Sequence, residues 1–168
     1  GEQLYFDASR PKCVEAAQYA LRTDSVVLLV RQMNRKKDVS LQDVCEVGTL
    51  ARIVKIQRVA GDAVRVIAQG LTRGKAFDMV GEEPYFLAEV ERCSERPYDP
   101  ATAEALRRRI AMRFQSYCDI SGRVAAESRV QVDEAQTPGE YADAVAQLVA
   151  HSLEDKQDIL EKIDIIPR

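Results

Sequence analysis

The sequence predicts an α+β protein, with a small, curved, partly closed β-sheet followed by an α-helical bundle. Three observations lead to this fold class. Residues 46–77 hold two long β-type stretches on either side of Gly61, which is typical of a hairpin. Further short strands marked by glycines follow up to residue 92, which indicates a curved sheet. From residue 101 onward apolar residues recur at helical spacing, which predicts helices.

The chain before the hairpin supplies two strands and a helix. Residues 3–7 are short and aromatic, and we interpret them as a strand. Apolar residues recur every three or four positions from Pro11 to Thr23, which predicts a helix with proline in its first turn. Residues 25–30 read SVVLLV, and this unbroken apolar run predicts a strand buried on both faces.

A polar and basic stretch at residues 32–39 separates this strand from the hairpin. We interpret it as an exposed loop, for which a solvated surface and a docking site for an acidic partner both remain open. Ser40 to Val44 fits one helical turn, with Ser40 as its N-cap and Asp43 at the capping-box position.

The hairpin and the strands after it form the predicted sheet. Gly61 can adopt positive φ in the hairpin turn, and Gly70 inside a strand pattern suggests a bulge or a barrel corner. A turn with Pro84 separates the last two strands. The expected strands are residues 48–59, 63–71, 75–80 and 85–92.

The composition changes at Cys93, where a proline-containing linker begins. One apolar stripe predicts a helix over residues 101–128, which Gly122 can interrupt. Thr137 and Ser152 are each followed three residues later by an acidic residue, which predicts two further helix starts. We therefore expect a β-rich domain at residues 1–97 and an α-helical domain at residues 98–168.

Composition excludes several classes of function. The net charge of −3 and the pI near 5.4 give no basic field for nucleic acid or anionic lipid. Four cysteines lie far apart and His151 is the single histidine, so neither a zinc site nor a Ser-His-acid triad is expected. No apolar run reaches the length of about 20 residues that a membrane helix needs, and no signal peptide is visible. We therefore expect free thiols and a cytoplasmic location.

One stretch, residues 70–76 (GLTRGKA), superficially resembles a phosphate-binding loop. Its two glycines are one residue too close, and Ala76 stands where a Ser or Thr must reach magnesium. Acidic pairs at Glu82–Glu83 and Glu89–Glu91 are interpreted as solvated. The residues therefore predict no catalytic, cofactor-binding or metal-binding site in this chain, and favour binding or assembly.

Four pieces of sequence then carry a family resemblance. Residues 46–53 read EVGTLARI, and the next strand ends in GLTR at 70–73. EPY and AEV follow within residues 83–90, and YAD and LEDKQDILE lie within 141–161. In this order, and over nearly the whole chain, they resemble the N-terminal domain of the Lon family of ATP-dependent proteases. The KQ-containing run is the most specific of the four.

The resemblance implies a PUA-like barrel followed by helices that lead toward an ATPase module. It implies a fragment that binds unfolded or damaged proteins and supports assembly of a homo-hexamer. ATP and magnesium binding, and peptide hydrolysis by a Ser-Lys dyad, would occur elsewhere in the parent chain. Two departures are visible. The family's opening strand is missing, with Gly1 matching its last glycine, and the family continues beyond Arg168 into AAA+ ATPase and protease domains.

A receptor for unfolded proteins needs exposed apolar side chains, and methionine adapts to varied partners. The substrate-binding candidates in the sheet domain are Tyr5, Phe6, Met33, Phe77, Tyr85 and Phe86.

Two other functions stay open. One is a stand-alone Lon-N-like adaptor without protease activity. The other is a sugar- or RNA-binding barrel, although the net negative charge of the chain disfavours RNA binding.

Overall fold

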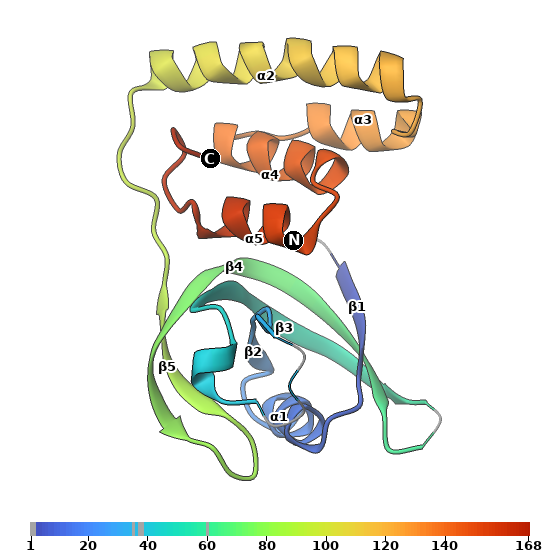
Figure 1. The fold of residues 1–168 in the computed structure, drawn as a ribbon, viewed down its shortest axis with the longest axis vertical. Helices are drawn as coiled ribbons and strands as arrows, with labels where there is room; N and C mark the ends of the chain where they lie inside the picture. The colour runs from blue at the N-terminus through green and yellow to red at the C-terminus, as the bar shows by residue number, and fades with distance from the viewer. Residues whose placement is uncertain (1–2, 35, 37–38, 60) are drawn as a thin grey trace. The chain divides into compact units, whose positions relative to one another are not determined.

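The computed structural model describes residues 3–34, 36, 39–59 and 61–168. The chain divides into two compact units, Gly1–Cys93 and Ser94–Arg168 (Figure 1). The first contains the sheet and the second contains only helices, so the predicted α+β class is confirmed. Elements of the first unit are β1 (Gln3–Ala8), α1 (Pro11–Arg22), β2 (Val26–Leu29), the 3-10 turn η1 (Leu41–Asp43), β3 (Val47–Arg58), β4 (Val64–Gly81) and β5 (Leu87–Arg92).

The sheet is antiparallel and is built around β4. Its strands run in the order β1-β4-β3-β2, and β5 pairs with the far end of β4. The β3–β4 pairing extends from Val47 opposite Lys75 to Arg58 opposite Val64, and Gly61 takes φ of 71° in the connecting turn. The predicted hairpin is therefore confirmed, while Ala60 of its turn lies outside the described residues.

The prediction of separate strands at 63–71 and 75–80 is wrong. β4 is one strand of 18 residues. Register shifts occur along it instead of a break, because a β-bulge lets a strand bend while its pairing continues. One of these shifts lies beside Gly70, as predicted, and its additional residue is Leu71.

Small residues form much of the first unit's core. Ala51, Val66 and Ala68 are fully buried in the sheet, and Ala17 and Ala20 of α1 belong to the same cluster. Side chains of this size let a helix approach a sheet closely. The strand predicted at residues 25–30 is confirmed as β2, but its burial on both faces is wrong. All four residues are half-buried, because β2 is an edge strand that pairs only with β3.

The second unit consists of four helices, and its first helix ends earlier than the longest prediction. Gly122 ends that helix in the left-handed conformation, with φ of 60°, so the interruption predicted at this glycine is confirmed. A continuous helix to Ser128 is wrong. The helices are α2 (Pro100–Ser121), α3 (Ala126–Asp133), α4 (Pro138–Val149) and α5 (Leu153–Glu161).

Side-chain caps fix where these helices begin. Thr137 and Glu140 form the complete capping box of α4, and Ser152 accepts a hydrogen bond from the Asp155 N–H at 2.9 Å. Both predicted helix starts are therefore confirmed. The unit's core gathers Phe114, Cys118, Val132, Tyr141, Val145 and neighbouring apolar residues. Within the described part of the chain, no helix is both long and apolar enough to cross a membrane.

Candidate functional site

The stretch that superficially resembles a phosphate loop lies inside a strand. Residues 70–76 belong to β4, so they do not form the loop and helix that cradle a phosphate. All four cysteines are free thiols. Burial, followed by the charge of Glu91, raises the pKa of the Cys93 thiol. Among the residues that the structure describes, no cluster of His, Cys, Asp or Glu is placed to hold a metal ion.

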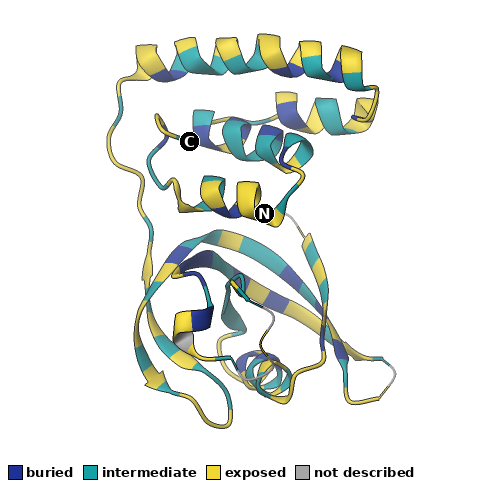
Figure 2. Ribbon diagram, in the orientation of Figure 1, coloured by how far each residue is buried: buried dark blue, intermediate teal, exposed yellow. Residues whose placement is uncertain are grey.

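A two-stranded extension of the sheet is the candidate site. β3 pairs with β4 only as far as Lys75, and the Ala76 N–H donates to the carbonyl of Glu46 just before β3. From Phe77 to Gly81, β5 is the only partner strand of β4 among the described residues (Figure 1). We call residues 76–91 the arm. None of its residues is buried (Figure 2). The arm therefore offers side chains, and the open edge of β4 opposite β5, to a partner.

Four register shifts in the sheet share one property. At each shift one strand carries an additional residue, and all four additional residues are large, apolar and exposed. A bulge breaks the alternation of inward and outward side chains, so an apolar residue can point to solvent while its neighbours stay packed. The four residues and their exposed fractions are Val54 (52%), Leu71 (43%), Phe77 (61%) and Val80 (59%).

Two of these residues, Phe77 and Val80, lie in the arm. Leu87, which pairs with Gly81, is 47% exposed beside them. The neighbours Ala76 and Met79 pair with half-buried residues of β5. We call Phe77, Val80 and Leu87 the apolar set of the arm. Of these three residues, only Phe77 was predicted from the sequence. The run AFDMVG at residues 76–81 does signal a bulge, because its alternation of apolar and polar residues is broken.

The other predicted residues of the first strand and loop differ in exposure. Tyr5 is 64% exposed, and its hydroxyl donates to Gln3 Oε1 at 2.6 Å. Phe6 is half-buried and packs against the core. Met33 is 54% exposed. No contact between these two exposed residues, Tyr5 and Met33, and the apolar set of the arm is seen among the described residues, and each stays a prediction as a substrate contact.

Tyr85 and Phe86 attach the arm to α1. The ring of Tyr85 lies against that of Tyr19, with centroids 4.9 Å apart, and burial followed by the neighbouring Tyr19 raises the pKa of Tyr85. The Lys12 ammonium lies 4.7 Å from the Phe86 ring centroid and pairs with Glu83 at 2.7 Å. These two aromatic residues therefore support the arm, and offer less surface to a partner than Phe77 does.

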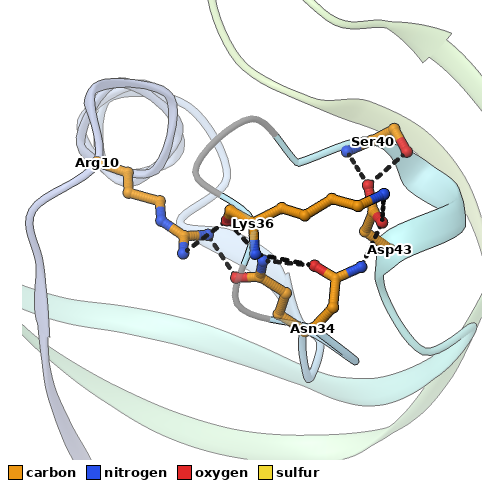
Figure 3. Close-up of polar contacts among 6 residues, drawn as sticks. Arg10, Asn34, Lys36, Ser40 and Asp43 are labelled. Carbon is orange, nitrogen blue, oxygen red and sulfur yellow. Dashed lines mark hydrogen bonds and ion pairs between the residues drawn. The ribbon is translucent and has the colours of Figure 1, made fainter.

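A hydrogen-bonded cluster around Asp43 holds the segment that carries Met33 (Figure 3). The Asp43 carboxylate accepts from the Ser40 N–H at 3.0 Å, the Ser40 hydroxyl at 2.8 Å and the Lys36 ammonium at 2.9 Å, and also from the Asn34 amide. These donors, the Ser40 N–H first, hold the pKa of Asp43 far below its ordinary value. The Met33 N–H donates to the Asp43 carbonyl.

This cluster confirms the predicted turn, since η1 follows Ser40 and Asp43 reaches back to the Ser40 N–H. It also shows that Lys36 is paired within the chain, although its side chain stays 65% exposed. Arg35 and Lys37, the other basic residues of the predicted loop, lie outside the described residues. A docking site for an acidic partner on this loop stays a prediction.

The arm is also strongly acidic. Residues 76–91 include five acidic residues and no lysine or arginine. Glu83 pairs with Lys12, whereas Asp78 and Glu89 are exposed and stand directly opposite each other across β4 and β5. Like charges in this position repel.

Comparison with known proteins identifies the family. The family model described as the ATP-dependent protease La (LON) substrate-binding domain matches residues 3–168. The chain belongs to this family. The resemblance to the Lon N-terminal domain predicted from four pieces of sequence is therefore confirmed.

Curated Lon proteases match this LON substrate-binding domain over almost all of its length. Identity is 31% over 166 residues with the enzyme of Desulforamulus reducens and 34% over 163 residues with that of Clostridium acetobutylicum. The matches cover 98% and 96% of this chain, but 20% and 21% of the two relatives. The chain thus spans about a fifth of the length of these relatives. The solved N-terminal domain of a Mycobacterium avium complex Lon protease aligns with 91% of this chain at 16% identity and a TM-score of 0.46.

Proposed function

We propose that this LON substrate-binding domain is the non-catalytic N-terminal domain of a cytoplasmic, ATP-dependent Lon-type serine protease. In that role it binds unfolded or damaged proteins and supports assembly of the hexamer. ATP, magnesium and peptide hydrolysis belong to other domains of the parent chain. The relatives support this placement, because the matched segment makes up only about a fifth of each.

The exposed apolar set of the arm carries the proposal. An unfolded protein differs from a folded one chiefly in the apolar side chains and backbone groups that it exposes. Phe77, Val80 and Leu87 are held in solvent by a paired β-ribbon, so they need no rearrangement to meet such side chains.

The open edge of β4 adds a second mode of contact. Beyond Ala76, whose N–H donates to the Glu46 carbonyl, the side of β4 that faced β3 has no partner strand among the described residues. An extended polypeptide can add itself to such an edge through backbone hydrogen bonds, which do not depend on its sequence. A folded client has its backbone groups already paired, so this mode also favours unfolded clients.

A binding assay with one client in two states tests the proposal. The chain should bind reduced, carboxamidomethylated ribonuclease A and should not bind the native enzyme, as measured by fluorescence anisotropy. The F77S/V80S double variant should bind the unfolded form about 10-fold or more weakly, because the removed side chains are the apolar anchors. Equal affinity for native and unfolded ribonuclease would contradict the proposed function.

The matched control is M112S/I120S in α2. Met112 and Ile120 are 72% and 87% exposed, so this variant removes a comparable exposed apolar surface from the helical unit. It should bind the unfolded client as the unaltered chain does. Loss of binding in the control but not in F77S/V80S would move the client site away from the arm.

Two further observations separate the parent protease from the adaptor without protease activity. The reading frame should continue beyond Arg168 into ATPase and protease modules, whereas a nearby stop codon would support the adaptor. The chain by itself should hydrolyse neither ATP nor peptide. Robust ATP turnover by these 168 residues would contradict a non-catalytic role.

A further inference from the structure

We propose that the arm selects unfolded segments in which large apolar residues are flanked by lysine or arginine. This inference rests on the proposed function, since it names the class of client that the same surface takes. It combines two independent features of the arm, its exposed apolar set and its largely unpaired negative charge.

The negative charge is concentrated and largely unpaired. Five of the chain's acidic residues fall within residues 76–91, where no basic residue occurs. Lys12 neutralises Glu83, with Nζ and Oε1 2.7 Å apart. The other four form no ion pair with any residue of the described part of the chain. These four exposed residues are Asp78, Glu82, Glu89 and Glu91.

The pair formed by Asp78 and Glu89 lies beside Phe77. Asp78 is the next residue after the bulge at Phe77, and Glu89 is its cross-strand partner. Two carboxylates in this arrangement repel each other, and a cation placed between them relieves that repulsion. Successive residues of an extended client are about 3.3 Å apart. A client whose apolar side chain lies on Phe77 therefore brings its flanking residues within reach of both carboxylates.

The same charges argue against other occupants. A second copy of the arm would place like charges against each other, so self-pairing of this edge is disfavoured. Acidic clients and nucleic acid phosphates are repelled for the same reason. Within the described residues no acidic cluster is arranged to hold a metal ion. A basic and apolar polypeptide segment satisfies both features of the arm.

The surface around Tyr5 provides an internal contrast. Asp7, two residues further along β1, is paired with Arg65, with Oδ1 and Nε 2.8 Å apart. An exposed aromatic residue beside a neutralised carboxylate has no preference for basic flanks. The charge preference should therefore depend on the arm and not on exposed aromatic residues in general.

Three fluorescein-labelled peptides with one apolar centre and different flanks test the inference with the full chain. The centre is Phe-Leu-Val, and the flanks are two lysines, two glutamines or two glutamates on each side. The lysine-flanked peptide should bind about 5- to 10-fold more tightly than the glutamine-flanked peptide at 50 mM salt. This ratio should approach one at 500 mM salt, because exposed charges are screened.

The D78N/E89Q double variant should lose this preference while it still binds the glutamine-flanked peptide. The matched control D62N/E134Q changes the net charge equally at two exposed carboxylates outside the arm, and should keep the preference. Circular dichroism verifies that both variants are folded. Retention of the full preference by D78N/E89Q, or equal binding of the lysine- and glutamine-flanked peptides, would overturn the inference and leave the proposed function standing.

Two other results have distinct meanings. Failure of all three peptides to bind would reject the proposed function together with the inference. A lysine-only peptide of equal length that binds as tightly as the apolar one would overturn the inference, because charge alone would then be sufficient.

Discussion

Gly48 of β3 lies against the backbone of Leu29 in β2, with no space for a side chain. A Cβ atom on Gly48 would overlap the Leu29 carbonyl oxygen and come within 2.8 Å of Val30 Cγ1. Backbone atoms cannot move aside as the end of a flexible side chain can. The glycine is thus required for close approach of the two strands.

Replacing Gly48 with alanine should destabilise the sheet unit. The added methyl group forces β2 and β3 apart, and overpacking of this kind costs about 1–3 kcal/mol. Urea unfolding followed by circular dichroism measures the loss. The control is G81A, where the nearest atom to an added Cβ is 3.9 Å away, an ordinary contact. A G48A chain that matches G81A in stability would show that the strands can separate at little cost.

The Asp43 cluster makes the sheet unit sensitive to acid. Hydrogen bonds lower the folded-state pKa of Asp43 below its ordinary value of 3.8, and the bond from the Ser40 N–H is the largest cause. The stabilisation is therefore complete above this ordinary value and is lost as the pH falls through it toward the folded-state pKa. The D43N variant should have a lower urea midpoint than the unaltered chain at pH 7, and this difference should shrink between about pH 5 and pH 2.

The control for Asp43 is D62N, which alters an exposed carboxylate in the turn before β4. This variant should keep the urea midpoint of the unaltered chain at pH 7. A difference between D43N and the unaltered chain that stays constant from pH 7 to pH 2 would mean that the carboxylate charge is not what stabilises the loop.

Arg168 should stabilise the helical unit. Its side chain is 1% exposed, and Nη1 lies 3.0 Å from Glu95 Oε1 and 3.4 Å from Asp143 Oδ2. Its Nε donates to the Lys162 carbonyl at 2.9 Å. R168M should lower the free energy of unfolding by about 2 kcal/mol, because the charged hydrogen bonds of a buried guanidinium are lost. Helix unfolding followed at 222 nm measures the change.

Arg109 provides the comparison for Arg168. It is exposed on α2 and forms no ion pair with the described residues, so R109M should change the stability by less than about 0.5 kcal/mol. Equal stability of R168M and R109M would show that the buried guanidinium contributes no more than an exposed one.

The sequence predicted the features that local chemistry decides. Gly61 in the hairpin turn, Thr137 and Ser152 at helix starts, and Gly122 at a helix end each follow from the conformation or capping ability of one residue. The hairpin was likewise predictable, because alternation and a glycine turn lie within one continuous stretch.

Features that depend on a partner strand could not be predicted in the same way. Whether residues 63–81 form one strand or two is decided by bulges, and a bulge exists only relative to the strand opposite. Val80 and Leu87 were missed for this reason, since their exposure follows from register. The burial of β2 was overestimated because an apolar run does not show whether its strand lies in the middle or at the edge of the sheet.

Two fragments of the chain test where the helical domain begins. The sequence places the domain boundary after Pro97, and this stays a prediction. In the structure, however, Glu95 pairs with Arg168, and the Arg96 Nε lies 3.7 Å from the Asp164 Oδ2. Both pairs lie within the helical unit. A fragment of residues 94–168 should therefore be more stable than one of residues 98–168, by about 1–2 kcal/mol. Thermal unfolding of the two fragments by circular dichroism measures the difference. E95Q in the longer fragment should remove part of it, and identical melting of both fragments would support the boundary after Pro97.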